Sequence, residues 1–558
     1  MLLARLLLLV LLESLSWWCF VLPGAFVELG SEAHARAVEP GANRRQRQAG
    51  ALEMALVQVE PLCRLGLQAL AAPLLAAVDA VLADEEAPRE TCDGLGDAED
   101  GGGRTVVDAV RRYLEAAPGD VLEALLQAVL ARSDVPGAAR CAALRLLLRA
   151  DVRSLGVGVL AAEHHARAVR CLRAQGAGLR ALDLKGAWLR GVDLDAFCEA
   201  LRSLGALRVL GVPHAATDKL LEAVAEHCPK LTALDVSGET DVSRRGLEAL
   251  CRGAGAPKAL QVLDVGNLAE ASVSAEDAAF LLRSLPNLRS LGSYARVGAA
   301  LLALQDQDGE DAERAALRLE YLRDIGTTTR AADAILALCP SLRAVYLDAP
   351  EPGVLPALAA LPLLADLKLH QFDVRELERL LSTAGAGVRV TELELLFGRA
   401  GPLDLTRLAT LCPGLQRLEC YFVDCSSSGR AAWRALQSVG VFHAQLARHA
   451  LLDLALGAPR LQRLGVGCAL PDLSDTDVQD LCGAELQEVW LAQAVRLTQA
   501  AALCFLTGCP RLTSLGELSG WDVTPDQVEE LRRHCELSNL DVGLWYFPRD
   551  GALGIFEA

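Results

Sequence analysis

The chain has 558 residues, a formal net charge of −18 and a hydrophobic content of 52%, whereas aromatic residues make up only 4%. Because its sequence pI is about 5.1, the chain lacks the basic footprint that attracts nucleic acids and anionic membrane surfaces. We therefore expect proteins as its partners, and neither nucleic acid nor membrane. The length allows a long repeat solenoid or several domains.

Residues 1–50 are predicted to be an apolar N-terminal segment followed by a disordered joint. The leucine-rich run over residues 2–12 resembles the core of a secretory signal peptide. Glu13 interrupts the run, and a small-x-small cleavage pattern comes only at residues 35–37. We therefore favour an N-terminal extension over a signal. The alternative is a true signal within residues 1–25, which would make the chain secreted or membrane-linked.

Residues 51–150 are predicted to form a small helical module. Apolar residues recur at helical spacing over residues 51–83 and again over residues 105–150. An acidic stretch over residues 84–100, followed by three glycines, indicates a solvated joint between the two helical parts. The plainest interpretation of this module is a helical cap on the repeats that follow.

A recurring apolar pattern organises residues 151–543. It reads Leu-x-x-Leu-x-Leu, often after Cys-Pro, as it does from Cys228 and from Cys339. The copies begin at Leu179, Leu207, Leu231, Leu260, Leu288, Leu319, Leu342, Leu364, Val390, Leu415, Leu461, Leu486, Leu512 and Leu537. One gap is nearly twice as long as the others, and a degenerate copy at Leu436 divides it. This period is typical of leucine-rich repeats, in which each unit is a short strand followed by a helix.

The repeats predict an α/β leucine-rich-repeat solenoid, with a parallel sheet on the concave side and helices on the convex side. The apolar residues of the pattern point between strand and helix, and the residues between them point outward. Because one unit cannot bury its apolar face alone, stacked neighbours must cover it. Residues 544–558 are predicted to be a C-terminal tail, with Trp545 and Phe547 covering the end of the core.

The residues at the outward positions change along the chain. Early copies carry small and acidic residues, whereas the copies from Leu342 to Leu512 carry aromatic residues and arginine, which are enriched at interface hot spots. We therefore predict a partner-binding surface on the concave side, formed by Tyr346, His370, Arg417, Tyr421, Arg463 and Trp490. The alternative is that these aromatic residues fill irregular gaps in the solenoid.

The 17 cysteines are interpreted as packing residues. Four of them, Cys228, Cys339, Cys412 and Cys509, stand directly before proline at the same place in the repeat. A buried free thiol behaves as a small hydrophobic group, and free thiols are typical of reducing compartments. We therefore expect a cytoplasmic or nuclear protein, with secretion as the alternative that a genuine signal would favour.

No constellation of catalytic residues is recognisable, and we expect no enzymatic activity, no cofactor and no metal. The glycine run at residues 101–103 lacks the lysine and the spacing of a phosphate-binding loop. Cys420 and Cys425 have no second cysteine pair that would complete a zinc site. His164 and His165 are interpreted as part of a solvated helix face.

The repeats resemble the cysteine-containing leucine-rich repeats of F-box proteins, most closely from Cys228 to Cys251. Two resemblances in the helical module point to adaptor binding. Residues 118–130 are similar to an F-box, although Ala117 replaces the usual leucine. Residues 59–67 are similar to the elongin-binding box of the zyg-eleven family, although Pro61 interrupts it. The adaptor-binding candidates are Leu62, Cys63, Leu67, Val121, Leu122 and Leu125.

Both families imply the same role. The resemblance implies a non-catalytic substrate-recognition subunit of a cullin-RING ubiquitin ligase, which binds a protein substrate on the concave repeat surface. Its implied partners are elongin or the F-box adaptor, together with a cullin. The alternatives are a secreted or membrane-linked leucine-rich-repeat binding protein and a scaffold with no link to a ligase.

Overall fold

The computed structural model describes Leu114 and residues 117–132, 135–238, 240–253, 255–266, 273–308, 316–383 and 385–547. The chain divides into two compact units, and the boundary between them falls after Leu260. Within the described residues, no helix combines the length and the apolar character needed to cross a membrane. The predictions for residues 1–50 and for the elongin-box candidates fall outside the described residues.

The first unit contains a parallel sheet whose strands follow one another in chain order. These strands are β1 (Ser154–Gly156), β2 (Ala181–Asp183), β3 (Val209–Gly211) and β4 (Ala233–Asp235). The α-helices are α4 (Gly119–Leu130), α5 (Gly137–Leu147), α6 (His165–Gln175), α7 (Gly191–Ala200), α8 (Asp218–His227) and α9 (Arg244–Arg252). Three short 3-10 turns, Ala162–His164, Gly176–Gly178 and Leu201–Ser203, join these elements. Helices α5 to α9 pack successively against one another.

The sheet of the first unit begins one repeat before the first predicted copy. Val152, Leu155 and Val157 are buried and have the spacing of the repeat pattern. Strand β1 pairs in parallel with β2, so that Leu155 lies opposite Leu182. This copy has valine at the first and third apolar positions, so a search for leucines does not find it.

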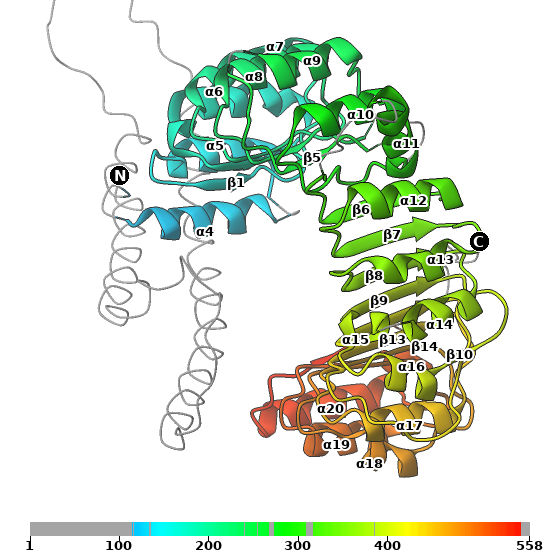
Figure 1. Ribbon diagram of the computed structural model, residues 1–558. Helices are drawn as coiled ribbons and strands as arrows, with labels where there is room; N and C mark the ends of the chain where they lie inside the picture. Colours follow the sequence, from blue (N-terminus) through cyan, green and yellow to red (C-terminus); the bar gives the residue numbers. More distant parts are fainter. Residues whose placement is uncertain are drawn as a thin grey trace, which may run out of the picture. The chain divides into compact units, whose positions relative to one another are not determined.

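The second unit contains a long parallel sheet covered on one side by helices (Figure 1). Within the described residues its strands, in spatial order, are β6 (Tyr321–Ile325), β7 (Ala344–Asp348), β8 (Asp366–His370), β9 (Glu392–Leu396), β11 (Arg417–Tyr421), β13 (Ser438–Phe442), β14 (Arg463–Ala469), β15 (Glu488–Gln493), β16 (Ser514–Gly516) and β17 (Gly543–Leu544). Outside this sheet are β5 (Val262–Asp264) and the short pair β10 (Leu403–Asp404) and β12 (Cys425–Ser426). The parallel order confirms the predicted leucine-rich-repeat fold.

Most strands of the second unit are separated by one or two helices. The helices of this unit are α10 (Ala275–Ser284), α11 (Val297–Asp308), α12 (Thr329–Leu338), α13 (Val354–Ala357), α14 (Val374–Ser382), α15 (Ala386–Arg389), α16 (Leu405–Leu411), α17 (Arg448–Gly457), α18 (Val478–Leu481), α19 (Gln499–Gly508) and α20 (Pro525–Leu537). Short 3-10 turns are Leu358–Ala360, Asp475–Asp477 and Leu518–Gly520. Many of these helices open on a side-chain cap, as α20 does with a capping box between Thr524 and Gln527.

The cysteines that precede proline close helices, as predicted. Cys228, Cys339, Cys412 and Cys509 are the C-terminal caps of α8, α12, α16 and α19, and all four are buried. A small apolar side chain suits this place because the chain turns there from the helix into the next strand. Each of the fourteen cysteines within the described residues is a free thiol.

Two predicted repeat copies have different outcomes. The degenerate copy at Leu436 is confirmed, because β13 follows it and pairs with both β11 and β14. The copy at Leu537 is wrong, because Leu537 is the last residue of α20 and is 83% exposed. Leu540 and Val542 complete the repeat spacing by coincidence, whereas the strand that continues the sheet is β17, in which Leu544 lies opposite Leu515.

Candidate binding surface

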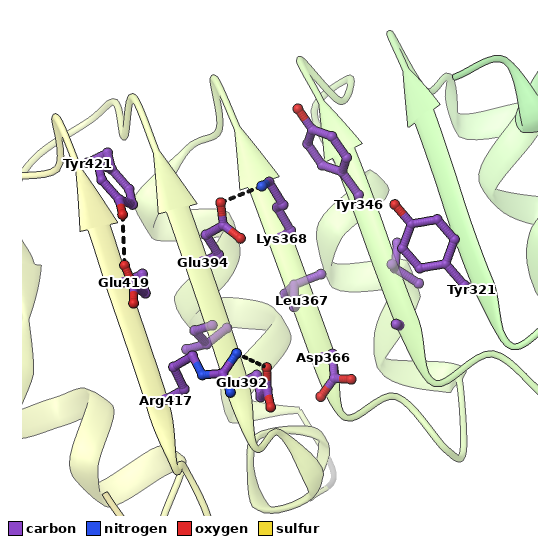
Figure 2. Close-up of a pocket in the computed structure, with 13 residues that line it drawn as sticks. Tyr321, Tyr346, Asp366, Leu367, Lys368, Glu392, Glu394, Arg417, Glu419 and Tyr421 are labelled. Atoms are coloured by element: carbon purple, nitrogen blue, oxygen red, sulfur yellow. Dashed lines mark hydrogen bonds and ion pairs between the residues drawn. The ribbon is translucent and has the colours of Figure 1, made fainter. Parts of the chain in front are cut away.

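The strands of the second unit present one face away from the helices, and we call it the concave face. On β6 to β11 this face contains an open pocket of about 280 Å³ (Figure 2). Its lining residues are Tyr321, Ala344, Val345, Tyr346, Asp366, Leu367, Lys368, Glu392, Leu393, Glu394, Arg417, Glu419 and Tyr421. The pocket is therefore built by residues of five neighbouring strands, most of them outward-facing, which parallel pairing holds in register.

Toward the β6 end of the pocket, the Tyr346 ring lies near two cations, of which Lys368 lines the pocket and Arg323 does not. The Arg323 guanidinium lies 4.7 Å from the centre of the Tyr346 ring, and the Lys368 ammonium lies 5.3 Å from it. Both distances are within the range of cation–π attraction. The aromatic face of Tyr346 is therefore already in contact with positive charge supplied by β6 and β8.

Ion pairs link the middle strands of the pocket. Lys368 pairs with Glu394 across β8 and β9, and Arg417 Nη1 lies 3.1 Å from Glu392 Oε2 across β9 and β11 (Figure 2). Asp366 instead accepts a hydrogen bond of 3.2 Å from the Thr391 hydroxyl. These pairs neutralise part of the negative charge of the lining.

The other end of the pocket is formed by Glu419 and Tyr421 of β11. The Tyr421 hydroxyl donates a 2.8 Å hydrogen bond to Glu419 Oε2. Burial and this bond to a carboxylate raise the pKa of Tyr421 to about 12, so its hydroxyl stays protonated at neutral pH. The Tyr421 ring stacks on Phe442 of the next strand, with 5.0 Å between ring centres.

Glycines on β13 and β14 leave the space that the Phe442 ring occupies. A Cβ atom on Gly467 would lie 2.5 Å from the Phe442 ring, and one on Gly465 would lie 3.1 Å from it. The ring therefore lies across β14, where any larger side chain would displace it. Gly440 lies beside Glu419 in the parallel register, and a Cβ atom on it would lie 2.7 Å from the Phe442 ring and 3.1 Å from Glu419 Oε2.

A second aromatic group follows the strands at their carboxyl ends. Phe397 and Phe422 stack with ring centres 4.6 Å apart, and Phe422 stacks on His443 at 4.9 Å. The two phenylalanines are 42% and 47% exposed. All three residues have a positive φ, between 51° and 55°, which turns each side chain toward its neighbour at the strand exit.

The structure brings together three of the six predicted partner-binding residues. Tyr346, Arg417 and Tyr421 line the same pocket. The other three lie on the same sheet outside it: His370 Nδ1 donates a 2.5 Å hydrogen bond to Asp348 Oδ1, Arg463 pairs with Glu488, and Trp490 lies over Gly516. Their role in binding stays a prediction.

The adaptor-binding candidates in the described residues all belong to α4. Leu122 and Leu125 are only 1% and 5% exposed, and Val121 is half-buried. Helix α4 packs against α5 and β1, so these leucines contribute to the core of the first unit. Leu62, Cys63 and Leu67 lie outside the described residues.

Several residues of this surface are absent from the predicted set. Tyr321 and Glu394 occupy outward positions of the copies that begin at Leu319 and Val390, so the repeat rule could have found them. Phe397, Phe422 and His443 follow the strands, where a left-handed backbone is usually supplied by glycine or asparagine. Nothing in the local sequence predicts that conformation for phenylalanine.

The prediction that His164 and His165 belong to a solvated helix face is wrong for His165. His165 is buried at the start of α6, where its Nε2 atom lies 3.0 Å from the Leu160 carbonyl oxygen. It is therefore part of the core and not of a solvated helix face. In the described part of the chain, no three His, Cys, Asp or Glu side chains converge as metal ligands would.

Comparisons with known proteins find similar chains among solved structures. No protein-family model and no curated protein matches the sequence. The chain is similar to one chain in the crystal structure of the Rad7 and Elc1 complex in yeast, with 12% sequence identity and a TM-score of 0.41. The match covers 87% of this chain and 96% of that chain.

Proposed function

We propose that this chain is a non-catalytic recognition subunit that binds a protein on the concave face of its second unit. The pocket between Tyr346 and Tyr421 is the observation that supports this role. It brings tyrosines and half-buried charged residues together on one open surface, and parallel strand pairing holds them in register. This is the composition of a protein-binding hot spot. We further propose that the chain presents this protein to a cullin-RING ubiquitin ligase in the cytoplasm or nucleus.

A protein fits this surface better than a small molecule does. The pocket is open and slightly smaller than the 300 to 1,000 Å³ or so that ligand cavities usually enclose. Exposed aromatic rings continue beyond it, from Phe397 to His443 along the strand ends. An exposed aromatic surface that spans several strands is typical of contact with another macromolecule.

The ligase part of the proposal is supported by the sequence resemblance alone. A helical module followed by cysteine-type repeats is the order found in both families that the sequence resembles. The transfer of ubiquitin would then be performed by a partner, and this chain would supply recognition.

The ligase link is tested by capturing the full-length tagged chain from cells. We expect a cullin to be recovered together with elongin or with the F-box adaptor. A triple alanine variant at Leu62, Cys63 and Leu67 should lose elongin while it retains proteins bound through the repeats. Recovery of neither adaptor nor cullin would reject the ligase link and favour a scaffold. Secretion of the tagged chain would favour the secreted alternative.

The binding surface is tested by Tyr421→Ala combined with Trp490→Ala. We expect the double variant to weaken capture of proteins by about a thousandfold, because each aromatic hot-spot residue typically contributes about 2 kcal/mol and the two together about 4 kcal/mol. The control is Trp188→Ala, which removes a tryptophan from the first unit that is 54% exposed. Circular dichroism should show that all variants are folded. Unchanged capture by the double variant would contradict a concave binding site.

A further inference from the structure

We infer that the Glu419 end of the pocket receives an arginine or lysine side chain from a basic segment of the partner protein. This inference rests on the proposed function, because it specifies the chemistry of the protein that the concave face binds. It follows from the charge of the lining, from the absence of an ion pair at Glu419 within the described residues and from the aromatic rings beside that carboxylate.

The pocket has more negative than positive groups. Its lining contains four carboxylates and two cations, and each cation pairs with one carboxylate. Within the part of the chain that the structure describes, Asp366 and Glu419 form no ion pair; each accepts a hydrogen bond from a neutral hydroxyl. Two carboxylates therefore remain available to a cation from outside.

Glu419 is the better placed of these two carboxylates. Glu394 lies directly opposite it on β9, and two like charges in register repel each other unless a cation lies nearby. Lys368 supplies a cation to Glu394. On the other side of Glu419, Gly440 has no side chain, and the Phe442 ring and the Glu419 carboxylate both lie over it. An incoming ammonium or guanidinium would therefore meet a carboxylate that lies beside an aromatic ring.

The aromatic residues beside Glu419 favour the same kind of group. Tyr421 lines the pocket and stacks on Phe442, so an aromatic wall adjoins the carboxylate. A carboxylate next to aromatic rings combines charge-assisted hydrogen bonding with cation–π attraction, and both select arginine and lysine. At the opposite end, Arg323 and Lys368 already contact Tyr346, so the external cation is assigned to the Glu419 end.

Other side chains would fit this end poorly. An acidic side chain would be repelled by Glu419 and Glu394, which lie on adjacent strands. An apolar side chain would take the Glu419 carboxylate out of water without supplying a partner for it. The partner segment is therefore expected to be basic, which also complements a chain with a net charge of −18.

The test selects peptides from a random library displayed on phage, with the immobilised full chain as target. We expect the selected peptides to be enriched in arginine or lysine. For a synthetic selected peptide, Glu419→Gln should raise the Kd by about tenfold to a hundredfold, because a charge-assisted hydrogen bond is lost. The matched control is Glu378→Gln on helix α14, which removes a carboxylate from the helical side of the second unit and should leave the Kd unchanged.

A second measurement uses a version of the same peptide in which citrulline replaces arginine, or norleucine replaces lysine. Either replacement should weaken binding to the wild-type chain, but neither should weaken binding to Glu419→Gln further, since the two changes remove one interaction. Peptides that depend on Tyr421 and Trp490 but carry no essential basic residue would overturn this inference and leave the proposed function intact. The absence of any peptide that depends on the concave face would overturn both.

Discussion

Asp324 is a buried carboxyl at a position where the next two repeats have leucine, Leu347 and Leu369. Its side chain is 3% exposed and accepts hydrogen bonds from the Gly298 backbone N–H at 2.8 Å and from the Thr327 hydroxyl at 2.7 Å. Burial raises the pKa of Asp324 to about 6, although these hydrogen bonds and the charge of Arg296 act in the opposite direction. Asp324 thereby joins β6 to the first turn of α11, which leucine could not do.

This raised pKa gives a pH dependence of known sign. The folded protein holds the Asp324 proton more tightly than the unfolded chain does, so its favourable contribution is complete below about pH 4 and is lost as the pH rises through about 6. Relative to Asp324→Asn, the wild-type free energy of unfolding should therefore fall by about 3 kcal/mol between pH 4 and pH 7.5. Parallel urea denaturation of both proteins over this pH range measures the difference.

Asp477 provides the matched control for that experiment. Its pKa is lowered to about 2, chiefly by hydrogen bonds from Arg448, and its stabilising contribution is therefore lost only as the pH falls from about 4 toward 2. Asp477→Asn should then destabilise the protein by a constant amount between pH 5 and pH 7.5. A difference between wild type and Asp324→Asn that does not change with pH would contradict the assignment to Asp324.

At the scale of the elements, the strands of the second unit end in a common way. Several strands are followed by one residue with positive φ: Gly326, Ala349, Gln371, Phe397, Phe422 and His443. In each case the backbone N–H donates to the carbonyl at the end of the next strand, as Ala349 does to His370 at 2.9 Å. The left-handed residue thus extends the ladder by one hydrogen bond and turns the chain out of the sheet.

A substitution at Ala349 measures the free-energy cost of this left-handed conformation. Ala349 is exposed, has a φ of 48° and makes no ring contact that would offset the strain. Ala349→Gly should stabilise the protein by about 1 kcal/mol, because glycine adopts this conformation without a Cβ clash. Thermal unfolding measures the effect. Ala344→Gly, within β7, is the control and should destabilise by about 0.5 to 1 kcal/mol. Destabilisation by both changes would show that the left-handed strand exit is not strained.

At the scale of the whole molecule, apolar spacing predicted the repeats well because stacking forces each unit to bury the same positions. It predicted β13 from Leu436 and missed β1, in which valines replace leucines. The candidate surface was only partly predictable. Outward residues such as Tyr346 and Tyr421 follow the repeat rule, whereas the stacking of Phe397 on Phe422 depends on strand exits that no local signal encodes.

The in-register parallel strands also fix the interval at which a partner lying across them meets equivalent side chains. Neighbouring strands are about 4.8 Å apart, so equivalent side chains of the concave face recur at that interval. An extended peptide repeats its side chains on one face about every 6.7 Å, whereas an α-helix advances about 5.4 Å per turn. An extended segment across β6 to β11 therefore falls out of step with the strands sooner than a helical one does. The spacing of the strands thus limits how many consecutive strands one partner segment can contact in the same way.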